Sequence, residues 1–236
     1  MAVRGLDLFS ERFAKFRDSF ILIGGGACDL WFAEQNLAFR ATKDLDIVLI
    51  LERMNAEFVA RFHEFVAEGE YDEQLRNEDG PPVLYRFSKP GKDEFPFMLE
   101  LFCREVSELD LDPDQHIIPV RMEDAQSLSA ILLHESYYNF LLAHCRESRG
   151  IMAADGMALI PFKARAWLDL TKRRAAGEQV KADDIKKHRN DVFRLAVTLP
   201  GEAGDPLPDE LASDVSGFLA QHSPDSDDWN AIQQAI

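Results

Sequence analysis

The sequence predicts an α+β (mixed α/β) fold, with an N-terminal mixed sheet and flanking helices followed by a mostly helical C-terminal part. Short apolar runs between glycine and proline turns dominate the first half, whereas apolar residues at helical spacing dominate the second. With 46% hydrophobic residues in 236, the chain has enough apolar side chains for a substantial core. This composition excludes a disordered or fibrous protein.

Predicted helices and strands alternate in the first half. Residues 7–20 place five apolar side chains near one helical stripe, and the run 20–23 predicts a buried strand. Glycines at 24–26 end that strand before a predicted helix over 27–35. Residues 45–51, apolar and β-branched over most of their length, predict another strand. The next predicted elements are a helix over 55–69 and strands over 83–87, 96–103 and 116–122.

The second half is mainly helical by the same criteria. Residues 127–133 fit a strand or a helix, and 134–147 predict a helix. A hairpin-like stretch then precedes an amphipathic helix over 162–175, with Pro161 near its first turn, and a helix over 181–199. We therefore expect three parts: a catalytic core over 1–125, a helical part with a basic segment over 126–199, and an acidic helical tail over 200–236.

The net charge of −16 argues against a general nucleic-acid coat protein, but the charge is unevenly distributed. Residues 163–194 hold ten Lys or Arg and five Asp or Glu, whereas residues 200–236 hold eight acids and no Lys or Arg. The basic segment is a candidate anion site, because local potential steers a charged ligand. The acidic tail either covers this segment or provides solubility.

Two features of the sequence indicate the cellular compartment: it has three widely separated cysteines, and it lacks a long apolar run. An odd number of dispersed cysteines fits reduced thiols better than a disulfide framework. No run approaches the roughly 20 apolar residues that span a bilayer. We expect a cytoplasmic protein with no membrane partner.

Two motifs near the start of the chain carry candidate chemistry. Gly24-Gly25-Gly26 lies between a predicted strand and helix, where backbone N–H groups can bind phosphate, although glycines also form plain turns. Asp44 and Asp46 lie two residues apart on a predicted strand and therefore point to one face. They could share a magnesium ion or be two solvated acids at a strand entry.

Later residues could complete the site. Glu100 lies within an apolar strand, so a shared metal or a buried arginine, Arg40 or Arg104, must compensate its charge. Lys163 and Lys187 in the basic segment could neutralise a triphosphate or lie on solvated helix faces. Asp191 could orient a substrate hydroxyl or pair with Lys187 at i, i+4.

Together these motifs resemble the nucleotidyltransferase superfamily and, more narrowly, the AbiEii/AbiGii-type toxin nucleotidyltransferases. The shared pattern is a glycine pair, then Arg, Ser or Thr ahead of Asp-x-Asp, a later acid on a strand, and two basic helical motifs. The matching residues here are Gly24, Gly25, Arg40, Thr42, Asp44, Asp46, Glu100, Lys163, Lys187 and Asp191. The chain departs from the pattern at two points: its glycine turn lacks a serine, and His188 replaces the first acid of the last motif.

The resemblance implies magnesium-dependent transfer of a nucleoside monophosphate from an NTP to an acceptor hydroxyl. It makes Asp44 and Asp46 the metal ligands, Glu100 a ligand or the base for the acceptor, and Asp191 an auxiliary catalytic residue. The residues it assigns to nucleotide binding are Gly24, Gly25, Arg40, Thr42, Lys163 and Lys187. In the better-known toxins the acceptor is RNA, often a tRNA end, and an antitoxin protein neutralises the activity. A small-molecule (antibiotic-type) nucleotidyltransferase and a non-catalytic nucleotide-binding module remain alternatives.

Overall fold

A computed structural model of the protein describes residues 3–73, 86–104, 117–120, 128–201, 206–224 and 229–234. The strands are β1 (Phe20–Ile23), β2 (Asp44–Leu49), β3 (Asp72–Glu73), β4 (Arg86–Ser88), β5 (Met98–Arg104), β6 (Ile117–Val120), β7 (Leu128–Leu133), β8 (Cys145–Ser148) and β9 (Ile151–Ala154). The helices are α1 (Leu6–Arg12), α2 (Gly24–Glu34), α3 (Ala56–Glu68), α4 (Glu135–Ala143), α5 (Gly156–Ala175), α6 (Ala182–Ala196), α7 (Asp209–Ala220) and α8 (Trp229–Gln233). Two short 3₁₀ turns lie at Ala14–Phe16 and Leu51–Arg53.

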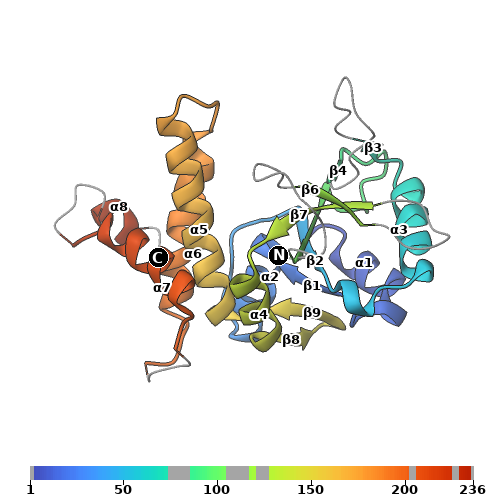
Figure 1. The fold of residues 1–236 in the computed structure, drawn as a ribbon, viewed down its shortest axis with the longest axis horizontal. Coiled ribbons are helices and arrows are strands. Elements are labelled where there is room, and N and C mark those ends of the chain that lie inside the picture. The colour runs from blue at the N-terminus through green and yellow to red at the C-terminus, as the bar shows by residue number, and fades with distance from the viewer. Residues whose placement is uncertain are drawn as a thin grey trace.

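The predicted α+β class is confirmed: a mixed sheet with flanking helices is followed by a helical C-terminal part (Figure 1). In the sheet β1 lies between β2, which is antiparallel to it, and β9, which is parallel. Strand β2 is parallel to β5, and β5 also pairs with β4 and β7. The sheet thus continues beyond residue 125, where the sequence placed the end of the core, because strands β7 to β9 all join it.

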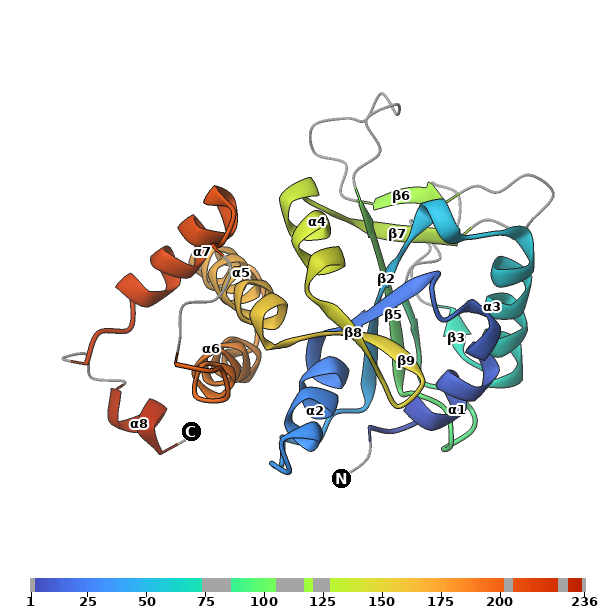
Figure 2. The ribbon, with the colours of Figure 1, turned by 90° about the horizontal axis from the view of Figure 1, so that it is seen from below.

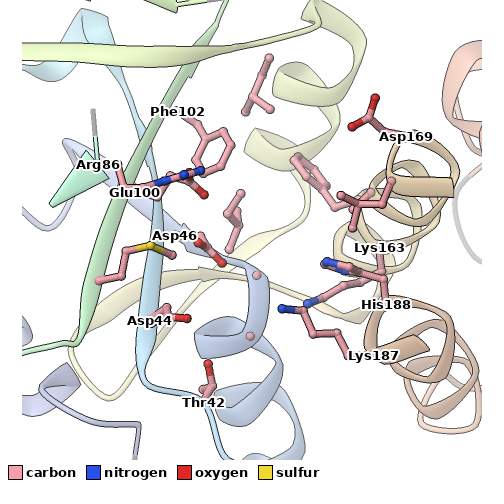
Figure 3. Close-up of a pocket in the computed structure, with 18 of the residues that line it drawn as sticks. Thr42, Asp44, Asp46, Arg86, Glu100, Phe102, Lys163, Asp169, Lys187 and His188 are labelled. Atoms are coloured by element: carbon pink, nitrogen blue, oxygen red, sulfur yellow. The ribbon is translucent and has the colours of Figure 1, made fainter. Parts of the chain in front are cut away.

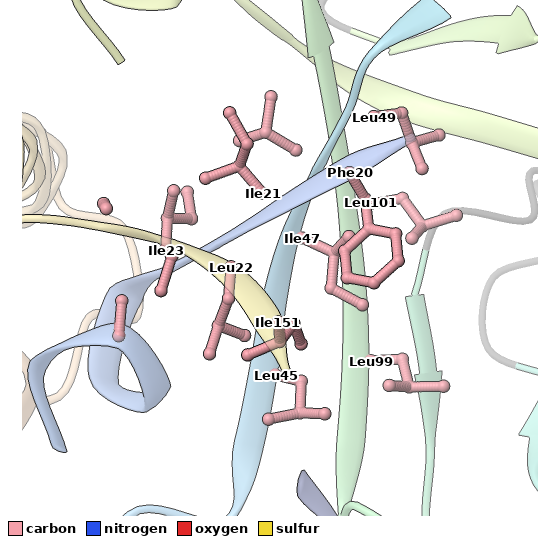
Figure 4. Packing of buried hydrophobic residues seen from close by; sticks show 14 of the residues in the cluster. Phe20, Ile21, Leu22, Ile23, Leu45, Ile47, Leu49, Leu99, Leu101 and Ile151 are labelled. Carbon is pink, nitrogen blue, oxygen red and sulfur yellow. The ribbon is translucent and has the colours of Figure 1, made fainter. Parts of the chain in front are cut away.

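Alternation along β2 and β5 separates a buried face of the sheet from one that carries polar side chains. Leu45 and Ile47 on β2, with Leu99 and Leu101 on β5, are fully buried (Figure 4). Phenylalanines of α1, β1 and α3 extend this core, with Phe9 and Phe13 stacked at a ring-centroid distance of 4.3 Å. The intervening residues of both strands lie on the opposite face and are only half-buried, except Val48 of β2, which is fully buried. Polar side chains can therefore project from the middle of the sheet without entering the core.

Helix α5 begins at Gly156, earlier than the start at residue 162 that the sequence predicted. Asp155 caps α5 by accepting a hydrogen bond from the Ala158 N–H, so Pro161 lies inside the helix and not in its first turn. Helices α5 and α6 lie side by side next to the sheet, as both views show (Figures 1 and 2). Their position closes one side of the space in front of β2 and β5.

Part of the predicted acidic tail packs against α5. Phe218 of α7 meets Trp167 of α5 at a ring-centroid distance of 5.2 Å, and Asp214 pairs with Arg165 at 3.0 Å. Within the described residues, no ion pair joins the tail to the exposed cations near the α5–α6 turn. The described tail residues therefore contribute packing and do not cover that end of α5. In the described parts of the chain, every helix is too short or too polar to cross a membrane.

Candidate functional site

The three candidate carboxylates line one cavity of about 480 Å³. Asp44 and Asp46 lie on β2, and Asp46 is directly opposite Glu100 in the parallel pairing of β2 with β5. Since alternate residues share a face, all three side chains project toward α5 and α6 (Figure 3). The predicted convergence of these side chains on one face of the sheet is therefore observed.

The glycine motif abuts these carboxylates because Ile23, the last residue of β1, pairs with Asp46. Gly24 has a φ of 65°, and a Cβ there would overlap the Asp46 carboxylate. At Gly25 a Cβ would come within 2.7 Å of the Thr42 Oγ1. Both positions thus need glycine so that the start of α2 can approach β2. No side chain caps this helix, which leaves its first N–H groups directed at the cavity end.

Burial makes the ionised forms of Asp44 and Asp46 on β2 energetically unfavourable. Burial, reinforced by the nearby Glu100 carboxylate, raises the pKa of Asp46 to about 6. Burial also raises the pKa of Asp44, against the opposing effect of Lys43 and Lys187. The buried Oδ1 of Asp44 has no hydrogen-bond partner among the described residues. A bound cation would relieve both of these unfavourable features.

The cation that compensates Glu100 is Arg86, not Arg40 or Arg104 as the sequence suggested. Arg86 lies opposite Glu100 on the antiparallel neighbour β4, and its Nε donates to Glu100 Oε1 at 2.7 Å while its Nη2 bonds the same oxygen. Arg104 instead pairs with Glu52 at 2.7 Å. Arg86 thus compensates the Glu100 charge through Oε1.

Arg40 belongs to a separate ion network around Asp191. The Asp191 carboxylate accepts from Arg40 Nε at 2.9 Å and Nη2 at 2.7 Å, and from Lys163 Nζ at 3.1 Å. Burial would raise the pKa of Asp191, but Lys163 and Arg40 outweigh it and hold the pKa below its usual value. Asp191 is 1% exposed and does not line the cavity, whereas both cations do. Its geometry is that of a positioning residue behind them.

The other residues of the basic helix divide between structural and cavity positions. Lys187 lines the cavity but pairs with Asp184 at 2.8 Å, not with Asp191 as the i, i+4 spacing allowed. His188 also lines the cavity, and its Nδ1 is buried without a hydrogen-bond partner among the described residues. Burial and the adjacent Lys163 and Lys187 lower its pKa to about 3, so the imidazole is neutral.

Several cavity residues were not predicted as site residues. Arg86 gave no signal, because a charged residue at the end of a short predicted strand is ordinary. The helix α5 stripe Phe162, Ala166 and Leu170 has i, i+4, i+8 spacing, which sequence reasoning assigned only to amphipathic packing. This spacing was the one available signal for a helix face that borders the cavity.

The donor set fits a divalent cation at β2. Two neighbouring carboxylates, one with an unpartnered buried oxygen and one with a raised pKa, are oxygen ligands of the kind that Mg²⁺ prefers. Within the described ranges, no group of three or more His, Cys, Asp or Glu is arranged to hold a metal. In this arrangement Glu100 is engaged by Arg86.

No family model matches the chain, and no curated protein matches it significantly.

Proposed function

We propose that the protein is a magnesium-dependent nucleotidyltransferase that moves a nucleoside monophosphate from an NTP to an acceptor hydroxyl. The observation that carries the proposal is the shared face of Asp44, Asp46 and Glu100 beside the glycine start of α2. Phosphoryl transfer depends mainly on positioning and on charge compensation. A cavity with acids on the sheet and cations on the helices offers both.

Each wall of the cavity has a distinct role in this proposal. Asp44 and Asp46 would hold Mg²⁺, which when bound offsets phosphate charge and lowers the pKa of a hydroxyl. Gly24 and Gly25 donate backbone N–H groups to phosphate oxygens. Lys163 and Lys187 provide positive charge for the triphosphate. Arg40 and Thr42, which also line the cavity, complete the nucleotide-binding set.

Glu100 and Asp191 act differently from each other. Glu100, whose Oε1 is bonded by Arg86, accepts the proton of the acceptor hydroxyl or joins the metal ligands through its carboxylate. Asp191 holds Arg40 and Lys163 in place, so its contribution to the reaction passes through them. We thus assign Asp191 a positioning role in place of the auxiliary catalytic one implied by the resemblance.

The finer proposal is a cytoplasmic toxin that modifies RNA, such as a tRNA end, and is neutralised by an antitoxin protein. Exposed cations around the α5–α6 turn support it, because phosphate backbones bind such residues; they include Lys172, Arg174, Lys181 and Lys186. A small-molecule acceptor is the second candidate, favoured by a cavity volume of about 480 Å³, which is within the range of small-ligand pockets.

The experiment is incubation of the protein with each labelled NTP and Mg²⁺, with and without total RNA. Label on RNA supports the toxin function, and label on a small hydroxyl compound supports the second candidate. Asp46→Asn should abolish the transfer, whereas Asp183→Asn, at an exposed site on α6, should leave it unchanged. Mg²⁺-dependent NTP binding without any transfer would make the protein a non-catalytic module and refute the enzyme proposal.

A further inference from the structure

Beyond Glu100 the cavity continues between the sheet and α5 as an apolar slot. Its sheet side is formed by Phe102, which follows Glu100 on the same face of β5, and by Leu133 at the end of β7. Its helix side is the α5 stripe Phe162, Ala166 and Leu170. These five residues define the apolar slot.

The slot differs chemically from the rest of the cavity. At the other end, Lys163, Lys187 and the glycine start of α2 present positive charge and N–H groups. The charged cavity residues nearest the slot are paired with each other: Asp169 with Arg173 at 3.7 Å on α5, and Arg86 with Glu100 on the sheet. A polyphosphate or a polycation would lose hydration there without compensation, whereas an uncharged ring would be stabilised.

The direction of phosphoryl transfer indicates which end of the cavity receives the leaving pyrophosphate and which receives the acceptor. The attacking and leaving oxygens lie roughly in line on opposite sides of the phosphorus. Asp46 lies between Glu100 on one side and Lys163 on the other (Figure 3). If the lysine end receives the leaving pyrophosphate, the acceptor enters from the Glu100 side. The first surface it meets there is the apolar slot.

We propose that the apolar slot binds a flat, uncharged, nucleobase-sized ring of the acceptor and so places the acceptor's hydroxyl at Glu100. This inference rests on the proposed nucleotidyltransferase function. Phe102 and Phe162 supply aromatic surface for the ring, and stacking of a base on such a side chain is a sequence-tolerant interaction. The acceptor class is a nucleoside unit, whether free or at an RNA end, and not a polycationic sugar.

The binding test uses adenosine as the probe, with Mg²⁺ and a non-hydrolysable ATP analogue at saturation. Ala166→Phe fills the slot, and Ala175→Phe makes the same change at an exposed site at the end of α5. By ligand-observed NMR, Ala166→Phe should lower adenosine affinity at least tenfold and leave affinity for the analogue within twofold. Ala175→Phe should change neither. Phe102→Ala is the second variant, should the larger side chain at position 166 disturb folding.

Each other result decides against the slot as the acceptor site. Equal loss of adenosine and analogue affinity would place the NTP's own base there, and unchanged adenosine affinity in both slot variants would overturn the inference. Displacement of adenosine by kanamycin would contradict the proposed acceptor class.

Transfer assays separate the source of the ring from the proposed function. Labelled product on adenosine indicates a free nucleoside acceptor, and product only on an oligoribonucleotide ending in adenosine indicates an RNA end. Transfer that survives both slot variants overturns this inference and leaves the nucleotidyltransferase function standing. Slot-dependent adenosine binding without any transfer by the native protein refutes the nucleotidyltransferase function and leaves adenosine binding in the slot standing.

Discussion

Replacing Asp191 by Asn removes the carboxylate that joins two cations and changes little else in shape. Asp191 is 1% exposed and the Lys163 side chain 4%, whereas the Arg40 side chain is 31% exposed. Removing one partner of a buried ion pair costs about 3–5 kcal/mol, because the other charge stays buried without compensation. Since Arg40 can turn to solvent and Lys163 cannot, we expect a loss of about 3 kcal/mol, at the low end of that range.

Thermal and denaturant unfolding at pH 7 measure this loss directly. For a domain of this size each kcal/mol shifts Tm by about 2–4 °C, so Asp191→Asn should lower Tm by about 6–12 °C. The pKa of Asp191 is held below its ordinary value of 3.8. Its contribution is thus fully present above about pH 4 and is lost as pH falls through the lower folded-state pKa. The difference in stability between the native protein and Asp191→Asn should therefore become smaller at acidic pH.

A double substitution provides the control. Asp191→Leu combined with Lys163→Met replaces the pair by apolar side chains, which should recover much of the stability, although NTP affinity stays low. A destabilisation by Asp191→Asn of less than about 1 kcal/mol would refute the view that Asp191 holds Lys163 in a water-excluded position. Such a value is typical of an exposed pair.

Three further predictions concern separate parts of the molecule. Gly24→Ala should destabilise the protein by roughly 1–3 kcal/mol and abolish Mg²⁺-dependent NTP binding, measured by calorimetry, because its φ is positive and its Cβ would displace Asp46. Because the pKa of Asp46 is raised to about 6, protons should compete with Mg²⁺ below that pH, and Asp46→Asn should raise the stability of the metal-free protein at pH 7. Phe218→Ala should cost about 3–5 kcal/mol in urea unfolding, whereas Leu219→Ala at a half-exposed site should cost less than about 0.5.

Sequence patterns predicted the parts of the site that depend on local periodicity. The two-residue spacing of Asp44 and Asp46 determines their shared face once the segment is a strand. The isolated acid in an apolar run correctly marked Glu100 as a residue in need of a partner. The glycines that the sequence placed after β1 lie beside Asp46 in the structure, because β1 and β2 are consecutive strands of the chain and pair directly.

Local sequence patterns could not predict which residues distant in sequence would form ion pairs. Arg86 and Glu100 meet through the pairing of β4 with β5, and Arg40 reaches Asp191 only because α6 packs in front of β2. Helical spacing offered Lys187 as a partner for Asp191, yet Lys187 bonds Asp184 one turn earlier. Local spacing thus identifies which pairs can form, and tertiary packing decides between them.

The cavity combines two surfaces of opposite charge from distant parts of the chain. Three of the four lining acids come from β2 and β5, and cations come mainly from α5 and α6. A metal–triphosphate complex has the complementary division, with a cation at one end and dispersed negative charge along the rest. Free triphosphate would be repelled by Asp44 and Asp46, and a free metal ion would gain nothing from Lys163 and Lys187. The arrangement therefore favours the complex over either component, which is the selectivity that the proposed function requires.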